Sequence, residues 1–341
     1  MLPVFLQAQY TEVINSNRPS RSMGAFSVGT NVYQWEQGLS MQNGTFSTFQ
    51  DAQFSGIGSR SQLRIGLFKE QLEFIGTMDY QNDTFSYTNW LGSQEINRTG
   101  YKEVSVGMKY LIFDPFRNED MYIPNIISWR KNNRFRWQDL IPVVAVYATA
   151  DFSLGDTYPY QETFAPLFRY YYKPISAPPI TATAMLLLQQ HIFPGWVLVH
   201  NAGMHYITTD FPAKKLIGTL TYSFRDRWSF YGEYQLDDSL LYSDLTLGTG
   251  AAYLLNKNMQ LDVAIQTSVK KTPHLFSAGI GFSFRFDKHK IYADSPQSNT
   301  DIKLARSERK SIKKTDKRMG KGLRKLDKKQ KRIERKINRK R

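Results

Sequence analysis

Apolar and polar residues alternate with a period of two along most of residues 1–286, which is typical of β-strands whose two faces meet different surroundings. The clearest run is 258–269, in which Met259, Leu261, Val263 and Ile265 alternate with Gln260, Asp262, Ala264 and Gln266. The polar faces carry Gly, Ser, Gln and Thr, whereas the polar face of a soluble sandwich would be rich in Lys and Glu. The pattern therefore favours the crowded interior of a barrel.

This alternation predicts a series of strands at about 30–43, 60–69, 71–80, 101–113, 140–152, 180–191, 195–207, 214–224, 227–236, 242–254, 258–269 and 275–286. An even strand number, with strands of roughly 10–13 residues, matches a tilted membrane-spanning barrel. The predicted fold class is all-β, a closed antiparallel transmembrane β-barrel of about 12 strands over residues 30–286.

The lengths of the connections test this barrel independently. Short links are expected at 69–70, 192–195, 225–226 and 256–258. They alternate with long polar links at 44–59, 81–100 and 153–179. Short turns at the periplasmic end and long loops outside are typical of outer-membrane barrels. One link on the short-turn side, 114–139, is long, and 121–131 within it could form an interfacial helix.

Composition supports an envelope location. Aromatic residues make up 14% of the chain, and no run of about 20 apolar residues is available for a transmembrane helix. Rings near the short turns would form an aromatic girdle: Trp196, Phe224, Trp228, Tyr253 and Phe286. An even strand count places the N-terminus and the C-terminal tail in the periplasm. We therefore predict an outer-membrane protein of a Gram-negative-type cell envelope.

The segments outside the barrel have distinct characters. Residues 1–8 are expected to be the remnant of a signal peptide, with Ala8 at the cleavage position. Residues 9–29 form a lead-in that either enters the lumen as a plug or is mobile. Residues 287–300 are expected to be a linker before a basic periplasmic tail at 301–341.

Charge is concentrated at the C-terminus. Residues 287–341 hold 22 Lys and Arg against 7 Asp and Glu, so the whole formal charge of +15 belongs to them. An apolar stripe at heptad spacing runs along the tail: Ile312, Met319, Leu323, Leu326, Ile333 and Ile337. The tail could form a coiled coil with a partner, an amphipathic helix on anionic lipid, or a solvated and mostly disordered segment. Its expected partners are an envelope protein, peptidoglycan or anionic lipid, and not nucleic acid.

Motifs of known chemistry are absent from the sequence. It has no GxSxG, Walker, GxGxxG, HExxH or EF-hand pattern and no cysteine. His200 and His205 differ by five positions, so in one strand they would face opposite sides and could not share a metal. We therefore expect no enzyme, no metal site and no cofactor.

Charged and amide side chains on the predicted inner face are the candidate functional residues: Arg64, Glu103, Lys109, Glu233, Gln235, Gln260, Asp262 and Arg285. In a narrow 12-stranded lumen such charges could pair across the barrel as structural ties, or they could line a path for solutes. The sequence leaves both roles open.

The last predicted strand, Gly279 to Phe286, resembles the C-terminal signal that the barrel-assembly machinery reads. Its glycine is followed by alternating rings, namely Gly279, Phe282, Phe284 and Phe286. The resemblance implies that this machinery and outer-membrane lipid are partners of the chain.

Residues 14–286 as a whole resemble the outer-membrane family described as "MetA-pathway of phenol degradation", and in style they are similar to barrels of the Bacteroidetes group. The resemblance rests on ordered short motifs: 15–20, 28–29, 33–38, 63–66, 107–109, 201–203, 231–234, 250–262 and 279–284. Asn17 stands where the family usually has an acidic residue before Arg-Pro, so no salt bridge is expected from that position.

The family resemblance implies a channel or transporter for small molecules, hydrophobic or aromatic ones included. The alternative is a structural or assembly subunit of an envelope complex that docks through its basic tail.

Overall fold

The computed structural model describes residues 13–47, 52–89, 92–117, 137–155, 157–158, 160, 178–225 and 227–288. Its strands are β1 (Val32–Phe46), β2 (Ala52–Gly66), β3 (Leu72–Asn89), β4 (Gly92–Phe113), β5 (Val143–Phe152), β6 (Ile180–Phe193), β7 (Trp196–His205), β8 (Ala213–Phe224), β9 (Trp228–Asp238), β10 (Ser243–Asn256), β11 (Met259–Ser268) and β12 (His274–Asp287). Two short 3₁₀ helices, η1 (Pro115–Arg117) and η2 (Trp137–Leu140), lie between β4 and β5.

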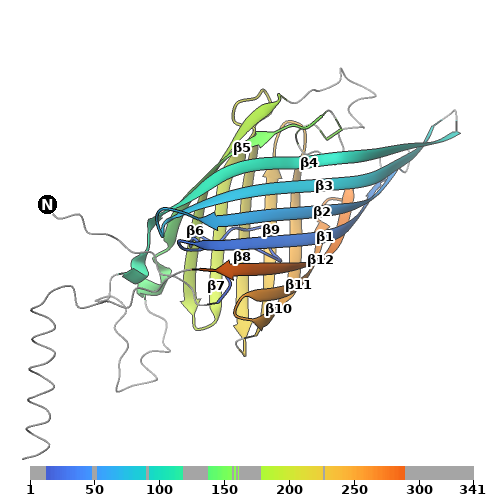
Figure 1. Cartoon of the computed structure of the whole chain (residues 1–341). Coiled ribbons are helices and arrows are strands. Elements are labelled where there is room, and N and C mark those ends of the chain that lie inside the picture. Colours follow the sequence, from blue (N-terminus) through green and yellow to red (C-terminus); the bar gives the residue numbers. More distant parts are fainter. Residues whose placement is uncertain are drawn as a thin grey trace, which may run out of the picture. The chain divides into compact units, whose positions relative to one another are not determined.

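Each strand pairs with its neighbours in the sequence, and β1 pairs with β12 to close the sheet (Figure 1). All pairings are antiparallel, and the closing seam runs from Val32 opposite Asp287 to Thr45 opposite His274. Because every strand has two partners, the barrel leaves no unpaired edge for lipid to meet. The prediction of a closed antiparallel barrel with twelve strands is confirmed.

The outer face is an apolar band. Side chains such as Ile57, Val106, Val263 and Ile280 are more than half exposed, which a water-soluble sheet would not tolerate over such an area. Residues of the opposite parity, such as Gln34 and Asp262, are buried in the interior. The alternation seen in the sequence is therefore the division between lipid and lumen. Among the described residues, no helix is long and apolar enough to cross a membrane.

The aromatic girdle lies at the short-turn end. Trp196, Phe224, Trp228 and Phe286 are exposed there. The ring of Trp228 also lies 4.7 Å from that of Tyr253, centroid to centroid. Rings at this height match the preference of Trp and Tyr for the membrane interface.

Strands β2, β3 and β4 are longer than expected, which corrects two predicted loops. Residues 52–59 belong to β2, and most of 81–100 belongs to the β3–β4 hairpin, so the expected loops at 44–59 and 81–100 were wrong. Figure 1 shows β1 to β4 extending past the ends of the other strands. A strand of 22 residues, such as β4, spans about 70 Å, about twice what a membrane needs.

The outer face explains why the sequence did not reveal this extension. The T-shaped ring pair Tyr80 and Tyr101 lies at the edge of the apolar band, with centroids 5.4 Å apart. Beyond it, the outward residues become polar and bond to each other, as Thr84 does to Asn97 at 2.7 Å. Without apolar outward positions the segment looks like a polar loop, although its backbone pairing continues.

Inward side chains stabilise the extension. Phe46, Ala52, Phe54 and Phe85 form a buried apolar cluster. Next to it, the Arg98 guanidinium pairs with both Asp83 oxygens, at 2.7 and 3.0 Å. Tyr158, from the β5–β6 connection, donates a 2.8 Å hydrogen bond to Asp83 and stacks under Arg98. Burial and the Asp83 carboxylate raise the pKa of Tyr158, so its hydroxyl remains a donor.

The turns β2–β3, β6–β7, β8–β9 and β10–β11 are short, as predicted. Several expectations fall outside the described residues: the signal remnant at 1–8, the helix at 121–131, most of the link 153–179, and the linker and tail with their apolar stripe at 312–337.

Deleting residues 296–341 should leave the barrel folded. By Asp287, β12 already pairs along its length with β11 and β1, so the barrel is closed without the tail. We expect the truncated protein to keep heat-modifiable migration on gels, with a transition temperature within a few degrees of the full chain. A truncated chain that migrates as unfolded without heating would contradict this modular arrangement.

Candidate functional site: the barrel lumen

Residues 13–31, the lumen segment, precede β1 in the chain and run inside the barrel. Ala25, Phe26, Ser27 and Val28 are buried. The segment has no regular secondary structure, so its backbone groups need partners from the wall. The Val28 N–H donates to Glu73 at 3.0 Å, and the Ala25 N–H donates to Gln189 at 3.0 Å. Inner-face side chains thus replace the ladder bonds that the segment lacks.

Glu73 is the hub of a buried ion network. Its carboxylate accepts from Arg64 Nε at 2.5 Å and lies 3.1 Å from Lys109 Nζ. Arg64 also contacts Glu36 at 3.1 Å and donates to the Asn15 carbonyl at 2.7 Å. All four side chains are at most 1% exposed. Such buried charges persist only when paired and hydrogen-bonded, which is the case here.

Lys109 connects this network to the lumen segment. Its ammonium group donates to the carbonyls of Gly24 and Phe26, at 3.1 and 2.8 Å. Gly29 approaches the wall so closely that a Cβ on Gly66 would overlap its carbonyl. The sequence left open a structural or a permeation role for Arg64 and Lys109. In the structure both side chains are fully engaged in holding the segment.

Arg18 forms a second tie, to β11 beyond the closing seam. Its guanidinium makes a bidentate pair with Asp262, with Nη2 2.8 Å and Nε 3.2 Å from the carboxylate oxygens. Gln260 donates to the Arg18 carbonyl at 2.9 Å. Gly38 and Gly281 face each other across the closing seam, and a Cβ on either would overlap the guanidinium. The two glycines therefore make the space in which Arg18 lies.

Glu233 holds the middle of the segment. It accepts the backbone N–H of Arg21 at 2.8 Å and that of Ser22 at 3.3 Å. Gln235 donates to the other carboxylate oxygen at 2.7 Å. Asn201 forms a two-way pair with Met23, accepting its N–H at 2.6 Å and donating to its carbonyl at 2.9 Å.

The remaining predicted residues also lie on the inner face. Glu103 pairs with Arg60 at 3.4 Å. Arg285, near the short turns, donates to the Asn258 side chain at 3.1 Å and pairs with Asp287 at 3.4 Å. The structure thus places all eight predicted lumen residues on the inner face. Six of them belong to the three ties that hold the lumen segment, and Glu103 and Arg285 pair with other residues of the wall.

Apolar packing fills the other flank of the segment. Ala25 and Phe26, with Met23, pack on inward residues of β3 to β6: Ile75, Leu111, Val143, Ala145, Tyr147, Met185 and Leu187. His191 adds an edge-on ring contact to Phe26, with centroids 6.0 Å apart. Near the short turns, the barrel is therefore filled by ion pairs on one side and by apolar packing on the other.

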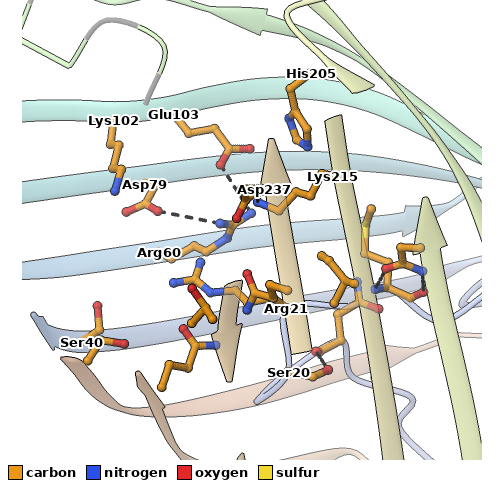
Figure 2. Close-up of a pocket in the computed structure, with 18 of the residues that line it drawn as sticks. Ser20, Arg21, Ser40, Arg60, Asp79, Lys102, Glu103, His205, Lys215 and Asp237 are labelled. Carbon is orange, nitrogen blue, oxygen red and sulfur yellow. Dashed lines mark hydrogen bonds and ion pairs between the residues drawn. The ribbon is translucent and has the colours of Figure 1, made fainter. Parts of the chain in front are cut away.

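A cavity of about 380 Å³ remains over the lumen segment. Its floor consists of residues 17–21 and Met23 of the lumen segment. A charged side consists of Arg60, Asp79, Lys102 and Glu103 on β2 to β4, and Figure 2 shows these side chains pointing into the space with Lys215 and Asp237 across from them. A more apolar side consists of Met23, Tyr147, Tyr160, Met185 and Tyr206. The space therefore offers both charged groups and ring-sized apolar surface to a small solute.

Sequence reasoning missed several residues of this site. Glu36, Glu73 and Asn201 share the inward parity of the predicted residues, so strict alternation could have found them. Arg18 and Arg21 precede the first strand and carry no periodic signal. At the family position before Arg-Pro, Asn17 donates to Gln62 at 3.0 Å and forms no ion pair.

Rings of the predicted assembly signal lie on the outer face, where Phe284 and Phe286 are exposed. Phe282 meets Trp35 edge-on across the closing seam, with centroids 5.1 Å apart. Gly279 has the inward parity and lines the cavity. Among the described residues, no group of three or more His, Cys, Asp or Glu is placed to hold a metal ion.

Glu73→Gln should destabilise the barrel. The change leaves Arg64 and Lys109 buried with less negative charge, a loss of about 3–5 kcal/mol. We expect a clearly lower temperature for the gel-mobility transition. Glu95→Gln, on the exposed part of β4, is the matched control and should be neutral. Equal transition temperatures for both variants would show that the network contributes no stability.

Comparison with solved structures gives distant similarities in architecture. The COG4313 outer membrane channel from Pseudomonas putida F1 has a TM-score of 0.49 at 9% identity, over 79% of this chain and 99% of that one. The translocator domain of the autotransporter NalP from Neisseria meningitidis has 0.40 at 10%, over 79% and 90%. A deltaS2 mutant of the TodX monoaromatic hydrocarbon channel has 0.43 at 10%, over 77% and 92%. Similarities this distant say nothing about a solute.

Comparison by sequence is more informative. No curated protein matches the chain. The family described as "Putative MetA-pathway of phenol degradation" matches residues 16–286, which include most of the lumen segment and all but the last residue of β12. This chain belongs to that family.

Proposed function

We propose that the protein is an outer-membrane channel for small molecules, seen here in a constricted state. The observation that carries the proposal is the cavity of about 380 Å³ inside a closed barrel, with a floor made by a separate segment rather than by the wall. Binding sites for small molecules commonly have volumes of about 300–1,000 Å³. A purely structural barrel would gain stability from filling this space with side chains.

The lining supports small solutes that have an apolar body and a polar group. Tyr147 and Met185 offer apolar surface next to the charged groups Arg60 and Glu103. The family description, which refers to phenol degradation, is consistent with small hydrophobic or aromatic solutes. Passage through the barrel requires the lumen segment to shift, because it fills the lumen below the cavity.

Orientation follows from the connections. Both ends of the barrel sequence, at Val32 and Asp287, meet at the short-turn end. In outer-membrane barrels this end faces the periplasm, so we place the N-terminus and the basic tail there and the β1–β4 extension outside. In the periplasm the tail's charge can meet anionic lipid headgroups, peptidoglycan carboxylates or an acidic envelope partner, each engaged Lys or Arg being worth about 1 kcal/mol near an anionic surface.

Liposomes that contain the purified barrel should take up small aromatic solutes, and planar bilayers should show a low conductance. Asp262→Asn weakens the tie to Arg18, a charged hydrogen bond worth about 1.5–3 kcal/mol, so openings should become roughly tenfold more frequent. Asp210→Asn, in the exposed β7–β8 connection, should behave like the wild type.

The channel proposal would be contradicted if neither the wild type nor Asp262→Asn showed solute uptake or conductance. Constant co-purification of the barrel with other envelope proteins would then favour the alternative of a structural or assembly subunit that docks through the basic tail.

Protease added to intact cells should spare residues 290–341 and cut them after the outer membrane is permeabilised. The reason is the periplasmic position of the β12 end in the proposed orientation. Antibody detection of a C-terminal epitope gives the readout. Cleavage of the tail in intact cells would invert the orientation.

A further inference from the structure

Arg21 differs from every residue around it in the lumen segment. Its side chain is exposed to the cavity, while its neighbours Ser22 and Ala25 are buried. Figure 2 shows Arg21 on the cavity floor, reaching toward the wall that carries Arg60. A guanidinium group thus points into the space that a solute would occupy.

Six other basic side chains of the described inner face form ion pairs with acidic residues. Arg18 pairs with Asp262, Arg60 with Asp79 and Glu103, Arg64 and Lys109 with Glu73, Arg98 with Asp83, and Lys215 with Asp237. In the described part of the chain, the Arg21 guanidinium has neither an ion pair nor a hydrogen bond. The site therefore holds a cation that the protein itself does not neutralise by contact.

In the constricted state, hydrogen bonds from the wall hold the backbone that carries this cation. Glu233 accepts the N–H groups of Arg21 and Ser22, and Asn201 bonds to both polar groups of the Met23 backbone. The Arg21 Cα thus lies between two N–H groups that Glu233 holds, so in this state mainly the side chain has to order when a ligand binds. A preorganised donor loses less entropy on binding than a mobile one.

Charges on the wall limit what Arg21 could bind. Asp79 and Glu103 both pair with Arg60, and at longer range Asp79 and Glu233 partly offset the charge of Arg21. A ligand with one negative charge would complete the pairing at Arg21. A second negative charge would be repelled by Asp79 and Glu103. The geometry therefore selects a monoanion.

We propose that Arg21 is the anchor for the carboxylate of a small monoanionic organic solute, whose apolar body lies against Tyr147, Met185 and the rings of Tyr160 and Tyr206. A planar guanidinium matches a carboxylate with two parallel hydrogen bonds. The cavity volume of about 380 Å³ suits a single-ring acid. The inference rests on the proposed channel function and names a solute class for its lumen.

The test is a calorimetric titration of the full-length barrel, in detergent, with benzoate and with its neutral relative benzyl alcohol. Wild-type protein should bind benzoate at least tenfold more tightly than benzyl alcohol, and chloride should compete at least tenfold more weakly than benzoate. Arg21→Gln should weaken benzoate binding by tenfold or more, the size of a lost charged hydrogen bond, and leave benzyl alcohol binding within twofold. Arg21→Lys should recover part of the loss.

Arg225→Gln, in the β8–β9 turn outside the cavity, is the matched control and should bind benzoate like the wild type. Gel mobility checks that each variant is folded. Equal benzoate affinity in the wild type and Arg21→Gln would overturn the inference. Competition by chloride at the affinity of benzoate would overturn it too, because the site would then be one for simple inorganic anions.

The two proposals fail separately. Titration in detergent needs no passage, so binding at Arg21 without any uptake by liposomes would count against the channel and not against the anchor. Uptake of neutral solutes without an effect of Arg21→Gln on benzoate binding would count against the anchor alone.

Discussion

The requirement that every backbone hydrogen bond be satisfied within the barrel is the constraint on which the rest of this structure depends. Lipid offers neither donors nor acceptors, so an open sheet would leave the edges of β1 and β12 unpaired at high cost. Pairing of these two strands along 32–45 and 274–287 removes both edges. Closure then forces the strands to curve around an interior, and that interior has to be filled by something other than a second sheet.

Filling the lumen accounts for the distribution of charge. A barrel of twelve strands is wide for side chains alone to fill, and here an extended segment occupies much of the space. This segment brings unpaired backbone groups into a region of low polarity, so the wall must present polar side chains to it. Glu73 serves both needs, because it accepts the Val28 N–H and neutralises Arg64 and Lys109. The buried charges of the inner face are thus a consequence of a segment without secondary structure.

Much of the barrel could be predicted from the sequence, because lipid imposes a strict period of two on the outer face. Strands such as β11 and β12 carry apolar outward residues along most of their length, and their expected bounds are close to the observed ones. The extension of β3 and β4 was missed because Asn82 and Thr84 face water, where polar residues are as stable as in a loop. The residues on the inner face of each strand could be predicted, because every second residue of a strand points to the same side.

What could not be predicted is which inner residues act together. Arg64 and Glu73 lie on β2 and β3, which a predicted short turn connects. The pairing register of these two strands therefore brings the two side chains together. Arg18 and Asp262 are separated by 244 positions, and they meet only because the lead-in folds back into the barrel. Nothing in the periodicity of residues 13–31 specifies that path. The site is therefore a product of closure and of the segment together, and neither strand pattern nor motif contains it alone.

The contacts that hold the lumen segment differ in burial, and this difference indicates how the segment can shift while the barrel stays intact. At the short-turn end, Ala25 and Val28 are buried, and the Glu73 and Lys109 side chains have no exposed area. Breaking the contacts there would leave buried charges without water to solvate them. At the cavity end, the Arg18 side chain is 18% exposed and Arg21 is exposed. When a hydrogen bond that borders the cavity breaks, water or a solute can take the place of the lost partner. This substitution lowers the free-energy cost of breaking the bond. Movement should therefore begin at Arg18 to Met23 and leave Gly24 to Val28 fixed, so that an occupant of the cavity acts directly on the part of the segment that is easiest to displace.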